Sequence, residues 1–146
     1  MNLLLQKVKH YPFSTVIIVI VWVLSLMPVP ETPLDDIKLI DKWTHIVMYG
    51  GVCFVIWVEY LHRHTAVSLK RLIVFGWLAP VMMGGLLELI QAWCTGGRRN
   101  GDPMDFVANT VGATLILCGG ILWVLFCARG RRAGSAGKSC KNDGRR

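Results

Sequence analysis

The sequence predicts an all-α fold: an integral membrane four-helix bundle with its N-terminus and C-terminus in the cytoplasm. Of the 146 residues, 53% are apolar and only 17% are charged, and the mean hydropathy is +0.48. The charged residues cluster between long uncharged runs, which is typical of membrane helices. We therefore expect one membrane domain over 1–128, with spans near 11–30, 43–60, 72–91 and 105–128.

The first uncharged run follows Lys7 and Lys9 and ends at Pro28 and Pro30. A secretory signal peptide is the alternative interpretation of such a run. No small-x-small cleavage site follows it, since the sequence there is Ser-Leu-Met-Pro at 25–28. An uncleaved first span is therefore favoured.

The second and third runs are short. Residues 43–58 cover about 24 Å at 1.5 Å per residue, less than the hydrocarbon thickness of about 30 Å. These runs span only with their polar ends included, so other helices must shelter His45. Pro80 is expected to kink the third span.

The fourth run, from Phe106 to Ala128, is long enough to cross with tilt, and its glycines favour close helix packing. A soluble helical bundle would need polar faces at helical spacing, and the first and fourth runs have none beyond Asn109. Residues 129–146 are expected to form a disordered, basic cytoplasmic tail. Because this tail directly follows an apolar helix, anionic lipid is favoured over nucleic acid as its partner.

The positive charges give the expected orientation. Four spans place twelve Lys and Arg residues on the side of the two termini and the 59–71 loop, and the remaining four, Lys38, Lys42, Arg98 and Arg99, on the other side. By the positive-inside rule the richer side is cytoplasmic. The predicted location is the bacterial cytoplasmic (inner) membrane.

Polar residues gather where three predicted spans meet the outer face. The candidates are Asp41, Lys42, His45 and Tyr49 on the second span, Glu88 and Gln91 on the third, Arg98, Arg99 and Asp102 in the connection, and Asp105 and Asn109 on the fourth. Residues spaced by three or four share a helix face. Interhelical glue is the simpler explanation, pairing Asp with Arg, Asn with Gln and His with Glu. Such bonds average only about 0.6 kcal/mol, and intramembrane ionisable groups are functional by default, which favours one outer pocket.

No cofactor and no metal are expected. The five cysteines are odd in number and contain no CxxC motif, so neither a disulfide framework nor a zinc site is favoured. One histidine with scattered carboxylates makes no recognised ligand set, and Mg²⁺ or Mn²⁺ chemistry is a weak variant.

The same segments resemble the VanZ-like family, whose pattern is DKxxH…Y, then ExxQ, R and DxxxNxxGA. The matching residues are Asp41, Lys42, His45 and Tyr49; Glu88 and Gln91; Arg98 or Arg99; and Asp105, Asn109, Gly112 and Ala113. The resemblance runs from about 41 to 113. It departs from the pattern in having two adjacent arginines and a basic tail. It implies a four-helix membrane protein and a link to low-level resistance to the glycopeptide teicoplanin.

Three functions compete. The first is a non-catalytic envelope factor that binds a lipid or cell-wall precursor headgroup, or the antibiotic. In it Arg98 or Arg99 holds the anion, because arginine forks suit phosphate, and Lys42, Tyr49, Gln91, Asp102 and Asn109 complete the binding set. The second is a membrane enzyme acting on a phosphorylated or acylated lipid. There His45 is base or nucleophile, Asp41 orients it, and Glu88 or Asp105 is the acid.

The third is a proton-coupled transporter, which four spans without an inverted repeat make plausible only as an oligomer. The expected partners are therefore membrane lipids, with a cell-wall precursor or a glycopeptide as candidate ligands and an oligomer as an open alternative.

Overall fold

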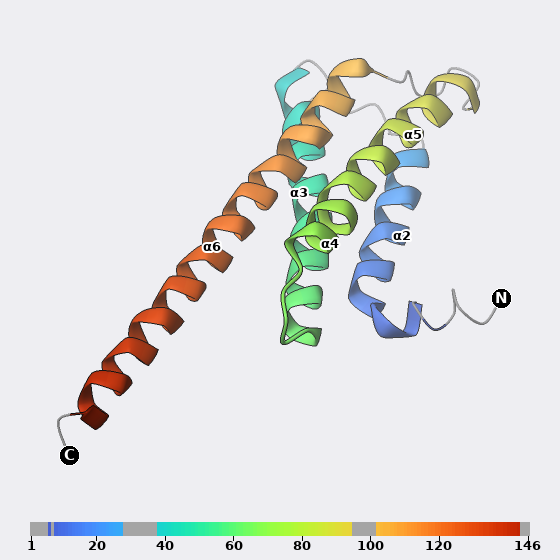
Figure 1. Cartoon of the computed structure of the whole chain (residues 1–146). Helices are drawn as coiled ribbons and strands as arrows, with labels where there is room; N and C mark the ends of the chain where they lie inside the picture. The colour runs from blue at the N-terminus through green and yellow to red at the C-terminus, as the bar shows by residue number, and fades with distance from the viewer. Residues whose placement is uncertain (1–5, 7, 28–37, 95–101, 144–146) are drawn as a thin grey trace.

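The computed structural model describes residues 6, 8–27, 38–94 and 102–143, and the regular structure in these ranges is all helical (Figure 1). The helices are α2 (Pro12–Leu26), α3 (Lys38–Arg63), α4 (Leu69–Ile73), the π-helical η1 (Val74–Leu78), α5 (Ala79–Cys94) and α6 (Pro103–Asp143). The all-α prediction is thus confirmed for the described residues.

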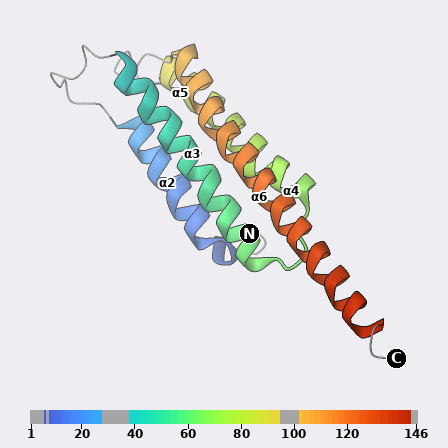
Figure 2. The ribbon, with the colours of Figure 1, turned by 90° about the vertical axis from the view of Figure 1, so that its left-hand side faces the viewer.

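The chain alternates in direction through α2, α3, the continuous segment α4–η1–α5, and α6 (Figures 1 and 2). The start of α3, the end of α5 and the start of α6 therefore meet at one end of the molecule, named here the polar end. The start of α2 and the end of α3 lie at the opposite end, named here the basic end, and a short connection leads from it to α4 (Figure 1). Lys9 just precedes α2, Arg63 ends α3, and Lys70 and Arg71 are in α4.

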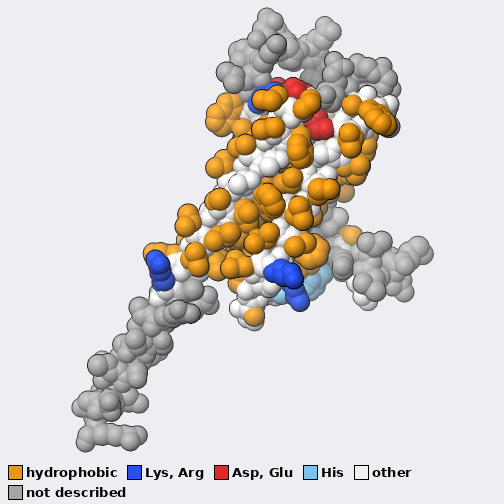
Figure 3. Space-filling model, turned by 45° about the horizontal axis from the view of Figure 1, so that its top comes forward, with side chains coloured by type: hydrophobic (Ala, Val, Ile, Leu, Met, Phe, Trp, Pro, Cys, Tyr) orange, Lys and Arg blue, Asp and Glu red, His pale blue; other side chains and the backbone are white. Residues whose placement is uncertain are grey.

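Among the described residues, three helical segments are long and apolar enough to cross a membrane: Ile40–Arg63, Leu69–Trp93 and Pro103–Cys127. Each has 24 or 25 residues, about 36 Å of helix at 1.5 Å per residue. Apolar side chains cover the flank between the two ends (Figure 3). Such an exposed apolar band on long helices indicates a membrane protein. Helix α2 is apolar but has only 15 residues, so a fourth crossing stays a prediction.

The third expected span is interrupted just before Pro80. It begins at Leu69, three residues earlier than expected, and η1 separates α4 from α5. The Ala79 N–H donates to the Val74 carbonyl, a wider turn than in an α-helix. Proline has no N–H, and its ring crowds the carbonyl four residues back, here that of Gly76. The expected irregularity thus takes the form of a π turn.

Helix α2 docks on α3 through a carboxylate that caps its first turn. Glu59 of α3 accepts hydrogen bonds from the Ser14 N–H at 2.9 Å, the Ser14 hydroxyl at 2.6 Å and the Phe13 N–H at 3.4 Å. The first N–H groups of a helix have no partner within it, and its N-terminus favours negative charge. Val21 of α2 then packs with Tyr49, Val52 and Leu87 in a buried cluster.

Helices α3 and α6 cross closely at glycines. A side chain on Gly112 would collide with the Ile46 backbone carbonyl, and one on Gly50 would lie 3.4 Å from the Gly112 oxygen. Further along, Trp57 packs against Gly76 of η1 and Gly120 of α6 so tightly that a side chain on either glycine would collide with its ring. The small-residue packing expected for the fourth span is therefore present at Gly112 and Gly120.

Helix α6 does not end at Ala128. Its backbone stays helical to Asp143, where disorder was expected from 129 (Figure 1). Extending an existing helix by one residue avoids the unfavourable nucleation step, so a preceding apolar helix can carry a polar segment with it.

Candidate functional site

Lys42 is the centre of an ion-pair group at the polar end. Its ammonium donates to Asp102 Oδ2 at 2.6 Å and to Asp105 Oδ1, and it lies 3.6 Å from Asp41 Oδ2. The sequence suggested Lys42 only as one member of a binding set. The structure shows that it ties α3 to the start of α6.

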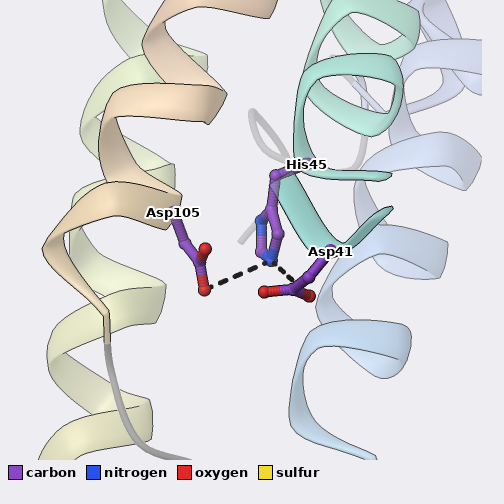
Figure 4. Close-up of side chains that lie close together, drawn as sticks. All are labelled: Asp41, His45 and Asp105. Atoms are coloured by element: carbon purple, nitrogen blue, oxygen red, sulfur yellow. Dashed lines mark ion pairs between the residues drawn. The ribbon is translucent and has the colours of Figure 1, made fainter. Parts of the chain in front are cut away.

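His45 is one helical turn deeper and is 5% exposed. Its Nδ1 lies 3.0 Å from Asn109 Oδ1. Its Nε2 faces two carboxylates, at 3.5 Å from Asp105 Oδ2 and 3.8 Å from Asp41 Oδ1 (Figure 4). The imidazole is thus clamped between the two helices, which is the shelter that the sequence demanded for it.

The start of α6 positions the acidic groups. Asp102 precedes Pro103, and its Oδ1 accepts from the Met104 N–H at 2.9 Å, so it caps the helix before a favourable first-position proline. The next turn brings Asp105 and Asn109 toward α3. The Lys42 ammonium, and then the Met104 N–H, hold the pKa of Asp102 below its ordinary value.

Three other predicted residues lie around this group. Glu88 is buried and accepts a hydrogen bond from the Asp102 N–H at 3.2 Å, which brings the end of α5 into the site. Gln91 points to α2 instead, where its Nε2 donates to the Ser25 carbonyl at 2.7 Å. Tyr49 lies deeper, beside Gly84, in the apolar core.

Some of the residues predicted to form the pocket therefore lie together. Asp41, Lys42, His45, Asp102, Asp105 and Asn109 come together, and Glu88 joins through the backbone of Asp102. Arg98 and Arg99 lie outside the described residues. Asn109 contacts His45, and Gln91 contacts the Ser25 carbonyl, where the glue interpretation expected asparagine with glutamine. The expected pairing of aspartate with Arg98 or Arg99 lies outside the described residues.

A second polar group, at the basic end, was missed by the sequence reasoning. Buried Glu59 binds the start of α2, and Arg63 lies 3.5 Å from its carboxylate. His64 stacks on Tyr60 with ring centroids 4.3 Å apart. In the sequence, this group could have been found from a single glutamate, Glu59, near the end of an apolar span. Because Glu59 caps α2, the group has a structural role.

The polar end also contains donors for a metal. One oxygen each of Asp41 and Asp105 and one nitrogen of His45 all lie within 4.8 Å of one another. His45 and Asp105 are buried and Asp41 is exposed. Residue spacing alone did not reveal this set, because Asp105 comes from another helix.

Comparisons with protein-family models, curated proteins and solved structures found no match to this chain.

Proposed function

We propose that this chain is a bacterial inner-membrane protein with four crossings and cytoplasmic termini, which binds an anionic lipid-like headgroup at its polar end. The observation that carries this proposal is the gathering of ionisable side chains from three helices at one end of an apolar helical protein. Such groups are costly near lipid and mark ligand sites by default. The helices on either side offer the ligand's tail an apolar surface.

Arg98 and Arg99 are the proposed anchors of the headgroup. They are four and three residues before Asp102 in the sequence, and extended chain covers at most about 14 Å over four residues. The described lysine at the site, Lys42, already pairs with two aspartates. A guanidinium fork suits phosphate, so these arginines are the cations best able to select an anion.

The ligand class follows from the resemblance to VanZ-like proteins. We propose a lipid or a lipid-linked cell-wall precursor as the normal ligand, with teicoplanin, which carries a lipid tail, as a competitor. Binding or shielding at the outer leaflet then lowers sensitivity to the antibiotic without any reaction.

The test compares cells with and without the protein for their lipid profile and their teicoplanin susceptibility. Binding predicts an unchanged lipid profile and a susceptibility that rises when Arg98 and Arg99 are both replaced by alanine. Arg129→Ala is the matched control, since Arg129 is an exposed arginine far along α6. If the double variant protects as well as the wild type, the arginine anchor is wrong.

The second candidate, a lipid-modifying enzyme, is favoured by the clamped imidazole of His45. A histidine held by Asn109 and facing Asp105 has the arrangement of an oriented general base. This alternative predicts a lipid species that changes when the protein is present and no longer changes in His45→Gln. An identical lipid profile with and without the protein excludes it.

A further inference from the structure

His45 presents its Nε2 atom to two carboxylates. With the amide oxygen of Asn109 as the acceptor, the contact at 3.0 Å uses Nδ1 of His45 as the donor. In the neutral ring Nε2 then carries a lone pair, and this atom faces Asp105 at 3.5 Å and Asp41 at 3.8 Å (Figure 4). No described side chain donates a hydrogen bond to it. A lone pair directed at two anions is stable only with a cation between them.

The cation can be a proton, which serves one carboxylate at a time, or a metal ion, which binds both. All three donor atoms lie within 4.8 Å of one another, as a shared metal requires. Metal–ligand bonds of about 2.1 Å put neighbouring donors about 3.0–3.4 Å apart. Small rotations of the exposed Asp41 side chain supply the difference.

The net charge of the polar end also favours a bound cation. Three aspartates, Asp41, Asp102 and Asp105, share the Lys42 ammonium, which leaves two negative charges uncompensated within this group. Lys42 uses Oδ1 of Asp105, whereas His45 faces Oδ2, so the second oxygen remains available. A divalent cation would neutralise the excess, and Asp105 would connect the cation to Lys42.

We propose that Asp41, His45 and Asp105 bind one divalent transition-metal ion at the polar end. An imidazole with two carboxylates suits Zn²⁺ or Mn²⁺ better than Mg²⁺ or Ca²⁺, which prefer oxygen ligands alone. Asn109 is the positioning residue, because it fixes the ring and directs Nε2 to the metal. Three protein ligands leave a position for water or for an oxygen of the headgroup.

The experiment titrates ZnCl₂ and MnCl₂ into the purified full chain in nanodiscs of neutral lipid, after removal of metal with a chelator. The expected result is one equivalent of metal per chain. We expect the metal affinity to fall at least tenfold in each of the ligand variants Asp41→Asn, His45→Gln and Asp105→Asn. It should fall about 10–100-fold in Asn109→Ala. The matched control, His62→Gln with His64→Gln at the basic end, should keep metal binding.

A second measurement uses the wild-type chain, so it tests the metal site even if the variants do not fold. With ¹⁵N-labelled histidine, Zn²⁺ should move the Nε2 resonance of one ring and leave its Nδ1 protonated. A proton on Nε2 at neutral pH in the presence of Zn²⁺ overturns the proposal. So does binding that survives His45→Gln but is lost with His62 and His64.

The metal site does not rest on the proposed headgroup binding. The metal titration uses no added headgroup, and the Arg98 and Arg99 test needs no metal. Failure of either one therefore leaves the other standing.

Discussion

At the residue scale, the polar end shows how one lysine organises several acids. Lys42 is three-quarters buried, with 25% of its side chain exposed, and it pairs with Asp102 and Asp105 at the start of α6. Asp102 is about half exposed and also caps α6. A capping carboxylate with a cationic partner couples helix stability to pH.

Asp102 should make stability fall in acid. Its folded pKa lies below the unfolded value because Lys42 and the Met104 N–H favour the carboxylate. Its contribution is therefore complete above the unfolded pKa of about 4 and is lost as the pH falls through the folded pKa. We expect Asp102→Asn to lower the midpoint of thermal unfolding at pH 7, and the gap to the wild type to close below pH 4.

The partner residue provides the control. In a Lys42→Met background the effect of Asp102→Asn at pH 7 should shrink, since the ion pair is already gone. A gap that is constant from pH 7 to pH 3 would show that Asp102 acts only through packing.

At the element scale, α3 and α6 are held by backbone contact at glycines. Gly112→Ala should destabilise the protein by about 1–3 kcal/mol, because the added carbon meets the Ile46 carbonyl and the helices must separate. Unfolding in mixed detergent micelles measures this. Gly119→Ala is the matched control on the same helix: nothing lies within 4 Å of the new carbon, so stability should hold or rise by up to about 1 kcal/mol.

The docking of α2 depends on Glu59. Glu59→Leu removes the acceptor of the Phe13 and Ser14 N–H groups and should cost about 1–3 kcal/mol. Hydrogen exchange at these two amides should accelerate more than exchange in α3. Ser68→Ala is the control, because Ser68 precedes α4 without making a side-chain cap. If the two substitutions have equal effects, the capping of α2 by Glu59 does not explain how α2 docks.

At the scale of the whole molecule, alternating helices separate an acidic polar end from a basic end. The apolar band between these ends matches the part of a protein that contacts lipid (Figure 3). The placement of the N-terminal segment depends on whether α2 crosses, since its described length of about 22 Å is less than the hydrocarbon core.

Single cysteines in a chain without native cysteines test this topology. With an impermeant maleimide on intact cells we expect labelling of Met104→Cys at the polar end and none of Ser68→Cys at the basic end. If α2 crosses, Lys9→Cys behaves like Ser68→Cys and reacts only after permeabilisation. Labelling of Lys9→Cys on intact cells would mean three crossings.

Much of this protein follows from its sequence alone. Long uncharged runs predict membrane helices because a polar group in lipid is costly wherever the helix points. Helical spacing puts Asp41 and His45 on one face, and the fourth span expected from 105 corresponds to α6, which begins at Pro103. These are local properties, so no knowledge of neighbouring helices is needed to read them.

Only the tertiary structure decided which polar groups meet. Lys42 pairs with Asp105 across 63 positions, and His45 meets Asn109 across 64, while Gln91 turns to α2 and Glu59 becomes the cap of a distant helix. Spacing within one helix says nothing about the rotation of the next helix against it. That rotation is set by close packing at Gly112 and Gly120. It brings acidic residues that are far apart in the sequence together around His45.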